Sequence, residues 1–367
     1  MIAIRQWTER VLGRGNAAIT VPVLDGALKS NRLIEDAEVV AEFDAPEDLA
    51  SDGHSLLLAD GARVLRVDGA GAHEVERRFD RTISALACLP GGGIAVALGG
   101  NEVRVVGGPH DGRRYDAAGG RRLNAVNALV CTSSGRLLAT DGSQTQPPER
   151  WKHDLMELGR TGRLVEFDLS DGSTRERATE LAYAFGAAPI GDDVVWVCES
   201  WRHRVVQIGG KFSGRAVVDA LPGYPSRIAP AQGGGWWLTC FTLRTQLVEF
   251  VLREPAFRKR MLKEIDPRFW IAPALTSGNT YLEPMQGAHL KTMGVVKPWA
   301  PPRSYGLVIR LDEQGLIRYS LHSRFDGKHH GVVAAAELDD WLYLLCKGPR
   351  RLLRLSVAHA RASLAAA

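Results

Sequence analysis

Apolar and polar positions along the chain follow a pattern that occurs six times. Each copy has a short strand of small residues, a turn rich in Gly, Asp or Ser, a strongly apolar strand, a polar loop and an amphipathic third strand. The copies begin near Pro46, Ile83, Val126, Tyr183, Pro225 and His330. Radial repetition of such sheets predicts a β-propeller, in which the small residues of each first strand fit the crowded central channel.

A more polar, alternating run precedes each copy, as in AEVVAEF, EVERRF, STRERATEL, RAVVDAL and IRYSLHSR. Alternation of this kind is typical of an outer strand with one solvated face. The fold class predicted is therefore an all-β, six-bladed propeller with four-stranded blades. Because the chain starts with an outer-type strand (37–43) and ends with an inner trio, we expect the N-terminal strand to complete the last blade.

The domain organisation predicted is one propeller, 37–358, preceded by an extension, 1–36, that packs on it, and followed by a tail, 359–367. Two insertions interrupt the repeat, at about 144–160 in the third blade and at about 253–302 before the outer strand of the sixth. Helical patterns in both (ERWKHDLMELG and REPAFRKRMLKEI) predict a helical cap. In the fifth copy we interpret TQLVEFVL as the third strand.

Composition is that of a globular protein, with 45% hydrophobic and 24% charged residues among 367. The net charge of +4 is spread over mixed signs, so we expect no nucleic-acid partner. Five cysteines without CxxC spacing lie in or beside apolar runs, which favours buried free thiols and a reducing compartment. Without a signal-peptide pattern or a membrane-length apolar run, the expected location is cytoplasmic.

Several motifs carry a family resemblance: PEDLASDG, NALVCTSSGRLLATDGS, GRLVEFDLSDG, LPGYPSRI with GGGWWLTC, and SYGLVIRLDEQG. With them, most of the chain resembles the strictosidine synthase-like group of six-bladed propellers, relatives of gluconolactonase, regucalcin and the paraoxonases. The resemblance implies a small-molecule site at the mouth of the central channel. It also implies a divalent ion such as Ca²⁺ at that site.

Carried over residue by residue, two of the family's metal ligands match Glu47 and Asn127. The other ligand positions fall on Phe185 and on Ser226 with Arg227. Because Ca²⁺ takes about 6–8 oxygen ligands, one carboxylate and one amide make a poor site. We hypothesise that Arg227 occupies the vacated position and pairs with Glu47; the alternative is that Arg227 points along a strand edge into solvent.

Two catalytic residues of the wider family do not carry over. The glutamate of strictosidine synthase falls on Val333, so the chain is not expected to be a strictosidine synthase. The histidine that paraoxonase-like lactonases use in blade two falls around Arg81 and Thr82.

Two histidines are candidates for proton transfer, because histidine titrates near neutral pH. His203 in ESWRHR follows the second strand of blade four, and Glu199 could orient it; the alternative is a loop histidine on the blade surface. In GKHHG at most one of His329 and His330 can face the channel, because adjacent strand residues point to opposite sides. His330 is preferred, and a solvated turn histidine is the alternative.

Other residues could line a ligand pocket. Arg303 with its aromatic neighbours could hold a carboxylate or phosphate, since arginine offers a bidentate fork; the prolines beside it could equally be rigid loop spacers. The candidate substrate-binding residues are Phe185, Tyr224, Ser226, Trp299, Arg303 and Tyr305. By contrast, Asp141 and Ser143 are expected to tie their own loop, and residues 151–155 to pack as an ordinary amphipathic helix.

The leading functional hypothesis is a small-molecule hydrolase of the lactonase or esterase kind at the channel mouth. Its candidate catalytic residues are Glu47, Asn127, Arg227, His203 and His330, with Glu47 and Asn127 as metal ligands only if a divalent ion is retained. Two alternatives stay open: a non-catalytic propeller that binds a small molecule or partner, and a cyclase or isomerase that uses the same cavity without the metal.

Overall fold

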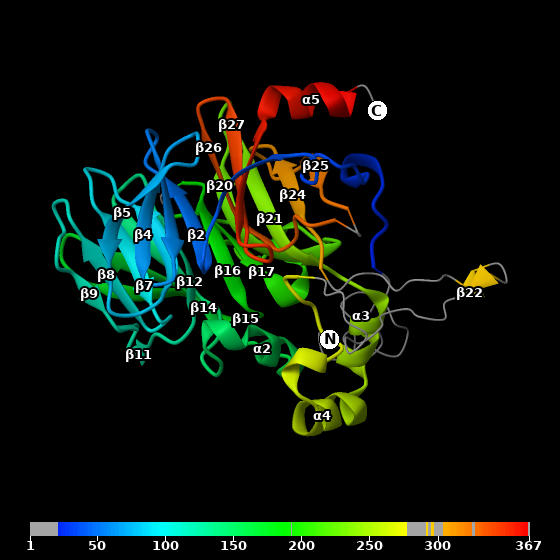
Figure 1. Ribbon diagram of the computed structural model, residues 1–367. Coiled ribbons are helices and arrows are strands. Elements are labelled where there is room, and N and C mark those ends of the chain that lie inside the picture. The colour runs from blue at the N-terminus through cyan, green and yellow to red at the C-terminus, as the bar shows by residue number, and fades with distance from the viewer. Residues whose placement is uncertain are drawn as a thin grey trace.

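The computed structural model describes residues 21–191, 193–276, 304–324 and 327–365, together with the backbone of 291–292 and 295–296. Six antiparallel four-stranded sheets surround one axis and form the blades of a propeller, as predicted (Figure 1). The innermost strands β2, β6, β12, β16, β20 and β26 each contact the next around a closed ring.

Each blade runs from its inner to its outer strand. Blade one consists of β2 (Pro46–Ser51), β3 (Leu56–Asp60), β4 (Arg63–Val67) and β5 (His73–Arg78). Blade two consists of β6 (Ile83–Cys88), β7 (Ile94–Leu98), β8 (Glu102–Val106) and β9 (Arg114–Tyr115). Blade three consists of β12 (Val126–Cys131), β13 (Arg136–Asp141), β14 (Gly162–Asp168) and β15 (Thr174–Leu181). Blades four and five are β16 (Ala184–Pro189), β17 (Val195–Glu199), β18 (Arg204–Ile208) and β19 (Ala216–Val218); and β20 (Gly223–Pro230), β21 (Trp236–Leu243), β24 (Leu307–Leu311) and β25 (Ile317–His322).

The last blade closes the ring as the sequence predicted. It consists of β26 (Val332–Leu338), β27 (Trp341–Cys346), β28 (Arg351–Ser356) and, as its outer strand, β1 (Glu38–Glu42). The two ends of the chain pair antiparallel there, with Glu38 opposite Arg354. Helix α5 (Val357–Ala365) follows the last strand.

The second insertion corrects the sequence interpretation. It lies between β21 and β24, so it interrupts blade five rather than preceding the outer strand of blade six. The segment interpreted as a strand, TQLVEFVL, begins helix α3 (Gln246–Arg253). Thr245 caps this helix by accepting from the Val248 amide, and Val248 and Val251 are buried at helical spacing. Alternation and helical spacing are hard to distinguish in so short a segment.

Each insertion contains the helix expected of a cap, α2 (Trp151–Glu157) in blade three and α4 (Pro255–Glu264) in blade five, and α3 joins them. Met156 of α2, Val251 of α3 and Met261 of α4 share a small apolar core with Trp270. The three helices lie together on one side of the molecule, and α5 lies on the opposite side (Figure 1).

Shorter elements connect these parts. They are the 3₁₀ turns η2 (Gly26–Leu28), η3 (Pro148–Arg150), η4 (Ser200–Arg202) and η5 (Pro267–Phe269), the hairpin β10 (Ala117–Ala118) and β11 (Arg121–Arg122), and the pair β22 (Lys291–Thr292) and β23 (Val295–Val296). None of the helices in the described ranges has the length and apolar character that a membrane crossing requires.

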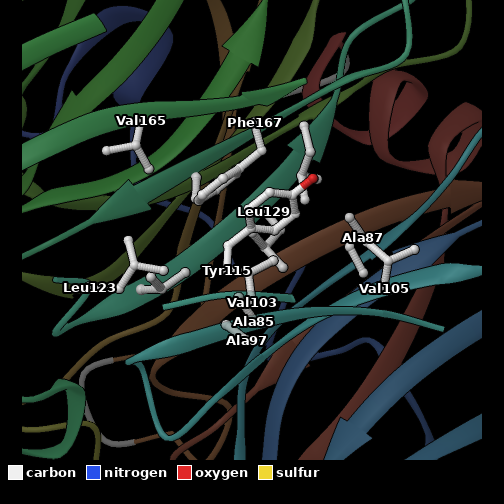
Figure 2. Packing of buried hydrophobic residues seen from close by; sticks show 14 of the residues in the cluster. Ala85, Ala87, Ala97, Val103, Val105, Tyr115, Leu123, Leu129, Val165 and Phe167 are labelled. Carbon is white, nitrogen blue, oxygen red and sulfur yellow. The ribbon is translucent and has the colours of Figure 1, made fainter. Parts of the chain in front are cut away.

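Apolar side chains fill the spaces between neighbouring blades. Between blades two and three, the rings of Tyr115 and Phe167 lie 4.7 Å apart, with Ala85 and Ala97 packed beneath them (Figure 2). Small residues on the inner strands let the blades approach closely near the axis, and aromatic residues fill the wider space outside. All five cysteines are free thiols, and Cys198, Cys240 and Cys346 are buried.

Candidate functional site

A bulge near the start of every inner strand brings one residue of each blade to the same level on the axis. In four strands a single residue falls outside the regular pairing: Glu47, Ser84, Asn127 and Val333. In blades four and five the register shift spans two residues, Phe185–Gly186 and Ser226–Arg227. A bulged residue leaves the ladder and changes the direction of its backbone groups. These positions include every ligand position that the sequence resemblance assigned to a metal.

The Arg227 side chain occupies this level of the axis and is 8% exposed. Its two terminal nitrogens donate to backbone carbonyl oxygens of four other blades. The acceptors are those of Glu47 (3.3 Å), Ser84 (3.3 Å), Asn127 (2.6 Å) and Val333 (3.3 Å). The alternative that Arg227 points into solvent is therefore wrong, and its guanidinium lies among the positions that the resemblance assigned to a metal.

Asp48 supplies the negative charge for this arginine. Its carboxylate lies 2.9 Å from Nε of Arg227 and accepts from the backbone amides of Leu49 (2.8 Å) and Leu86 (2.9 Å). Burial raises the pKa of Asp48 to about 6, against the opposing effects of Arg227 and the two amides. The pair is thus ionised at neutral pH. On the other side, the Phe185 ring lies 5.0 Å from the guanidinium carbon.

The expected ion pair between Arg227 and the Glu47 carboxylate is a wrong prediction. Glu47 offers Arg227 only its carbonyl oxygen, and its carboxylate pairs with the ammonium of Lys347. Both side chains of this second pair are partly accessible, at 26% for Glu47 and 31% for Lys347. Solvent therefore reaches the Glu47–Lys347 pair.

Asp48 and Lys347 were not among the residues predicted from the sequence. Asp48 stands beside Glu47 in the same PED motif, but the bulge at Glu47 is needed to direct the Asp48 carboxylate toward the axis. Lys347 directly follows β27 of the last blade. The signal that could have found it is ring closure itself, since the N-terminal strand that completes blade six places that blade beside blade one.

Asn127 connects blades three and four through side-chain hydrogen bonds. Its amide oxygen accepts from the Thr140 hydroxyl (2.7 Å), and its amide nitrogen donates to the Ala184 carbonyl (3.0 Å). Asp141 and Ser143 hold the loop as expected: Asp141 accepts from the Ala125 amide (2.7 Å), and the Ser143 hydroxyl donates to Asp154 (2.6 Å) in α2.

Aromatic side chains cluster over the arginine. Tyr183 stacks on Trp201 at 4.4 Å, and Phe241 lies 5.8 Å from Phe185 and 5.4 Å from Trp151 of α2. Burial raises the pKa of the Tyr183 hydroxyl well above its ordinary range. Residues 151–155 form an amphipathic helix as predicted, and its apolar face, with Trp151 and Leu155, contributes one wall of this cluster.

His203 has a different carboxylate partner from the one predicted. Its Nε2 faces Glu249 of α3 at 3.4 Å, whereas Glu199 pairs with Arg204. Burial lowers the pKa of His203. Burial also favours the neutral form of Glu249, but bonds from His203 and Arg244 outweigh this and lower its pKa to about 2. The pair anchors the cap helix to blade four.

The remaining candidates are bonded elsewhere or lie outside the described residues. His330 is buried and bonds through Nε2 to the Arg324 carbonyl at 2.9 Å. The Tyr305 hydroxyl bonds to His322 (3.2 Å), and the Ser226 hydroxyl to that of Thr239 (2.7 Å). Tyr224 is fully buried, its ring 4.6 Å from that of His203. Trp299 and Arg303 lie outside the described residues.

The axial residues do not fit a divalent cation. The carboxylate of Asp48 is paired with Arg227 and that of Glu47 with Lys347, so two positive side chains already balance the two acidic ones. Within the described ranges, no group of three or more His, Cys, Asp or Glu residues could hold a metal ion.

No family model matches the chain. Adipocyte plasma membrane-associated protein of Salmo salar is 26% identical over 361 residues, covering 88% of this chain and 78% of that protein. The mouse protein of the same name is 28% identical over 237 residues, which span 61% of this chain and half of the mouse protein. Protein strictosidine synthase-like 6 of Arabidopsis thaliana is 25% identical over 252 residues, covering 63% of this chain and 66% of that protein.

Among solved structures, a gluconolactonase from Xanthomonas campestris superposes with a TM-score of 0.55 at 15% identity, covering 90% of this chain and 93% of that one. A luciferin-regenerating enzyme superposes with a TM-score of 0.51 at 14% identity, covering 87% and 94%. The structural likeness shows the fold, and the sequence relatives show the kinship. The chain is thus similar in sequence to adipocyte plasma membrane-associated protein and to strictosidine synthase-like 6, and it shares the six-bladed propeller fold of the two solved enzymes.

Proposed function

We propose that the protein is a small-molecule hydrolase of the lactonase or esterase kind, and that Glu47 and Lys347 are its reacting polar groups. The observation that carries this proposal is the Glu47–Lys347 pair, which is partly accessible beside the axial Arg227. The donors of Arg227 are used on protein carbonyls and on Asp48, and the amide of Asn127 is used between blades. Those two residues therefore position and polarise the site without touching the substrate.

In this mechanism the Glu47 carboxylate accepts a proton from a water molecule as that water attacks the ester or lactone carbonyl. The ammonium of Lys347 stabilises the negative oxygen of the tetrahedral intermediate. When the bond between the acyl carbon and the alkoxy oxygen breaks, the proton passes from Glu47 to the leaving alcohol. The aromatic cluster of Phe185, Trp201 and Phe241 offers an apolar wall for the organic part of the substrate.

The test is turnover of a panel of γ- and δ-lactones and aryl esters by the wild type and by Glu47→Gln. We expect kcat/KM to fall by about 10²-fold or more in the variant, as for loss of a general base. Glu42→Gln is the matched control, since Glu42 is also paired with a positive side chain (Arg351, 2.8 Å) but lies on the outer strand of blade six. A Glu47→Gln variant with the wild-type rate contradicts the proposal.

A second candidate function is small-molecule binding without catalysis. It is favoured by the saturation of Arg227 and Asn127 by protein groups, which leaves few free donors at the axis. Saturable binding of a ligand together with no turnover across the panel would support it. A reaction of the strictosidine synthase type is disfavoured, because Val333 is buried and brings only its carbonyl to the axis. The cytoplasmic location stays a prediction.

A further inference from the structure

One guanidinium connects all six blades. Arg227 belongs to blade five and contacts each of the other five at the bulge level. Blade four contributes the Phe185 ring, and the other contacts are the carbonyl oxygens of Glu47, Ser84, Asn127 and Val333, with the Asp48 carboxylate. No single bond here is unusual, but their convergence on one side chain makes it the common ligand of the ring.

The oxygen atoms around Arg227 form a set that suits a hard cation. Backbone carbonyls and a carboxylate are the ligands that Ca²⁺ prefers. A guanidinium carries five N–H donors in a fixed plane. Here four of them donate to the four carbonyls, and Nε lies 2.9 Å from the Asp48 carboxylate in an ion pair without the geometry of a hydrogen bond. The four terminal donors of the side chain thus match the four carbonyls of the cage in number, and the Asp48 carboxylate balances the charge.

The backbone of blade four lies close to that of blade five at Gly186, next to Arg227. Gly186 has φ +94°, a conformation that L side chains rarely adopt. A Cβ atom at Gly186 would lie 2.4 Å from the Ser226 carbonyl oxygen and 2.6 Å from Cα of Arg227. Blades four and five can therefore approach closely only with glycine there. Phe185, the residue before it, covers the guanidinium and keeps water away from the ion pair.

We propose that Arg227 is a built-in cation that takes the place of a bound metal ion on the propeller axis, so that the ring is stable without one. The inference concerns only the stability and the metal content of the protein, and it is independent of whether the protein is a hydrolase. It follows from the geometry of this chain: a positive charge, held covalently, already satisfies the oxygen cage.

The first experiment measures the metal content of the purified wild type and its thermal unfolding in EDTA and in 5 mM CaCl₂. A protein that binds no stabilising ion has the same Tm in both, within about 1 °C. We expect this result, with metal far below one equivalent. A stoichiometric divalent metal, or a Tm that falls in EDTA, would overturn the proposal, and this arm needs no variant.

The second experiment vacates the cage with Arg227→Ala and uses Ca²⁺ alone as the probe. Removing the guanidinium leaves four carbonyls and Asp48 around a cavity, so millimolar Ca²⁺ should raise the Tm of the variant by about 3 °C or more. The wild type should not respond. A variant that unfolds at the same temperature with and without Ca²⁺ contradicts the inference.

Two controls separate this effect from general destabilisation. Asp48→Asn removes the negative partner but leaves the guanidinium in the cage, so we expect no response to Ca²⁺. Arg310→Ala removes another buried arginine, whose guanidinium lies 5.3 Å from the Trp237 ring and donates to the Trp236 carbonyl off the axis. A Ca²⁺ response in either control would count against a specific axial cage. If Arg227→Ala does not fold, Arg227→Lys keeps a charge on the axis, and a Ca²⁺-dependent Tm in that variant would equally overturn the proposal.

Discussion

Two buried arginines of this molecule can be compared directly. Arg227 lies on the axis, and Arg163 lies off the axis in β14, with no exposed surface and an ion pair to Asp141 at 3.0 Å. Both donate to several backbone carbonyls and pair with carboxylates, Arg227 with Asp48 and Arg163 with Asp141 and Glu176. Arg163 takes its carbonyls from the segment before blade three: those of Ala118, Arg121 and Arg122.

The difference lies in how far apart the partners are in the chain. The partners of Arg163 lie 13 to 45 residues away, whereas those of Arg227 are separated from it by 100 to 180 residues. Contacts between distant residues can form only after the intervening chain has been ordered. Arg163 therefore joins one blade to its adjacent hairpin, and Arg227 becomes satisfied only when the ring closes.

The largest effects expected are those of Arg227→Met and Arg163→Met. Each leaves a buried carboxylate without its partner, a change that costs about 3–5 kcal/mol in other proteins. Both variants should therefore lose similar free energy of unfolding in denaturant titrations. They should differ in hydrogen exchange, because local openings involve only the contacts they break. Arg227→Met should expose inner strands of several blades, and Arg163→Met mainly blade three and β10–β11.

The matched pair also shows how this comparison can fail. If Arg227→Met raises exchange only in blade five, the arginine does not connect the ring. If Arg163→Met raises hydrogen exchange in blades five and six, the contacts of Arg163 stabilise more of the ring than blade three and its adjacent hairpin. Both variants keep a long unbranched side chain, so the comparison isolates the charge and the hydrogen bonds.

The second prediction concerns the stability of the protein at acid pH, and it depends on His322. His322 is fully buried between the Tyr305 hydroxyl (3.2 Å) and the Ser320 hydroxyl (2.7 Å), and burial lowers its pKa from 6.5 to about 4. The unfolded chain binds the proton more readily, so this contribution to stability is complete above pH 6.5 and is lost as the pH falls toward 4. The difference between the two pKa values of His322 corresponds to about 3 kcal/mol in the free energy of unfolding.

The expected result is a loss of stability between pH 6.5 and 4 that His322→Gln reduces. Asn31 bonds to the Ser320 carbonyl and the His322 amide, so residues 27–34 should open first. Denaturant titrations at several pH values measure the first effect and hydrogen exchange the second. An unchanged pH profile in His322→Gln would assign the acid sensitivity to other groups.

The fold could be predicted because each blade carries its own local pattern. Inner strands of small residues, apolar second strands and polar outer strands recur. The first strand is of the outer type and the last three strands lack an outer partner, so the sequence predicted that β1 completes the last blade. The strand predicted at TQLVEFVL was wrong because its apolar spacing also suits a helix, and only packing against Met261 and Trp270 decides between the two.

The candidate site could be predicted only in part. The bulge positions Glu47, Asn127 and Phe185 were found through motifs, and the axial place of Arg227 was one of two alternatives. The partners could not be found, because Asp48, Lys347 and Glu249 meet their neighbours through ring closure and cap docking rather than through spacing along the chain. Sequence patterns identify positions within a blade, whereas pairing across the axis depends on the assembled ring.

The third prediction tests the close approach of blades four and five. Gly186→Ala places a methyl group against the backbone of Ser226 and Arg227, and we expect a loss of about 2 kcal/mol. Gly135→Ala is the matched control: Gly135 also has a left-handed backbone, with φ +80°, in the β12–β13 turn, but nothing lies within 4 Å of its Cβ position. It should lose about 1 kcal/mol. Equal losses in denaturant titrations would mean that the contact at the axis is not tight.

The smallest effect on stability is expected at the mouth of the same channel. Partly accessible ion pairs contribute about 0–1 kcal/mol, so Lys347→Met should change the free energy of unfolding by less than about 1 kcal/mol. If Lys347 stabilises the oxyanion, kcat/KM on the substrate found in the panel should nevertheless fall by about 10²-fold. Arg227 would then stabilise the ring of blades, and Lys347 would act on the substrate. Denaturant titration and kinetics on the same preparation separate these tasks, and a Lys347→Met variant that loses stability but keeps its rate would assign the mouth pair to the framework as well.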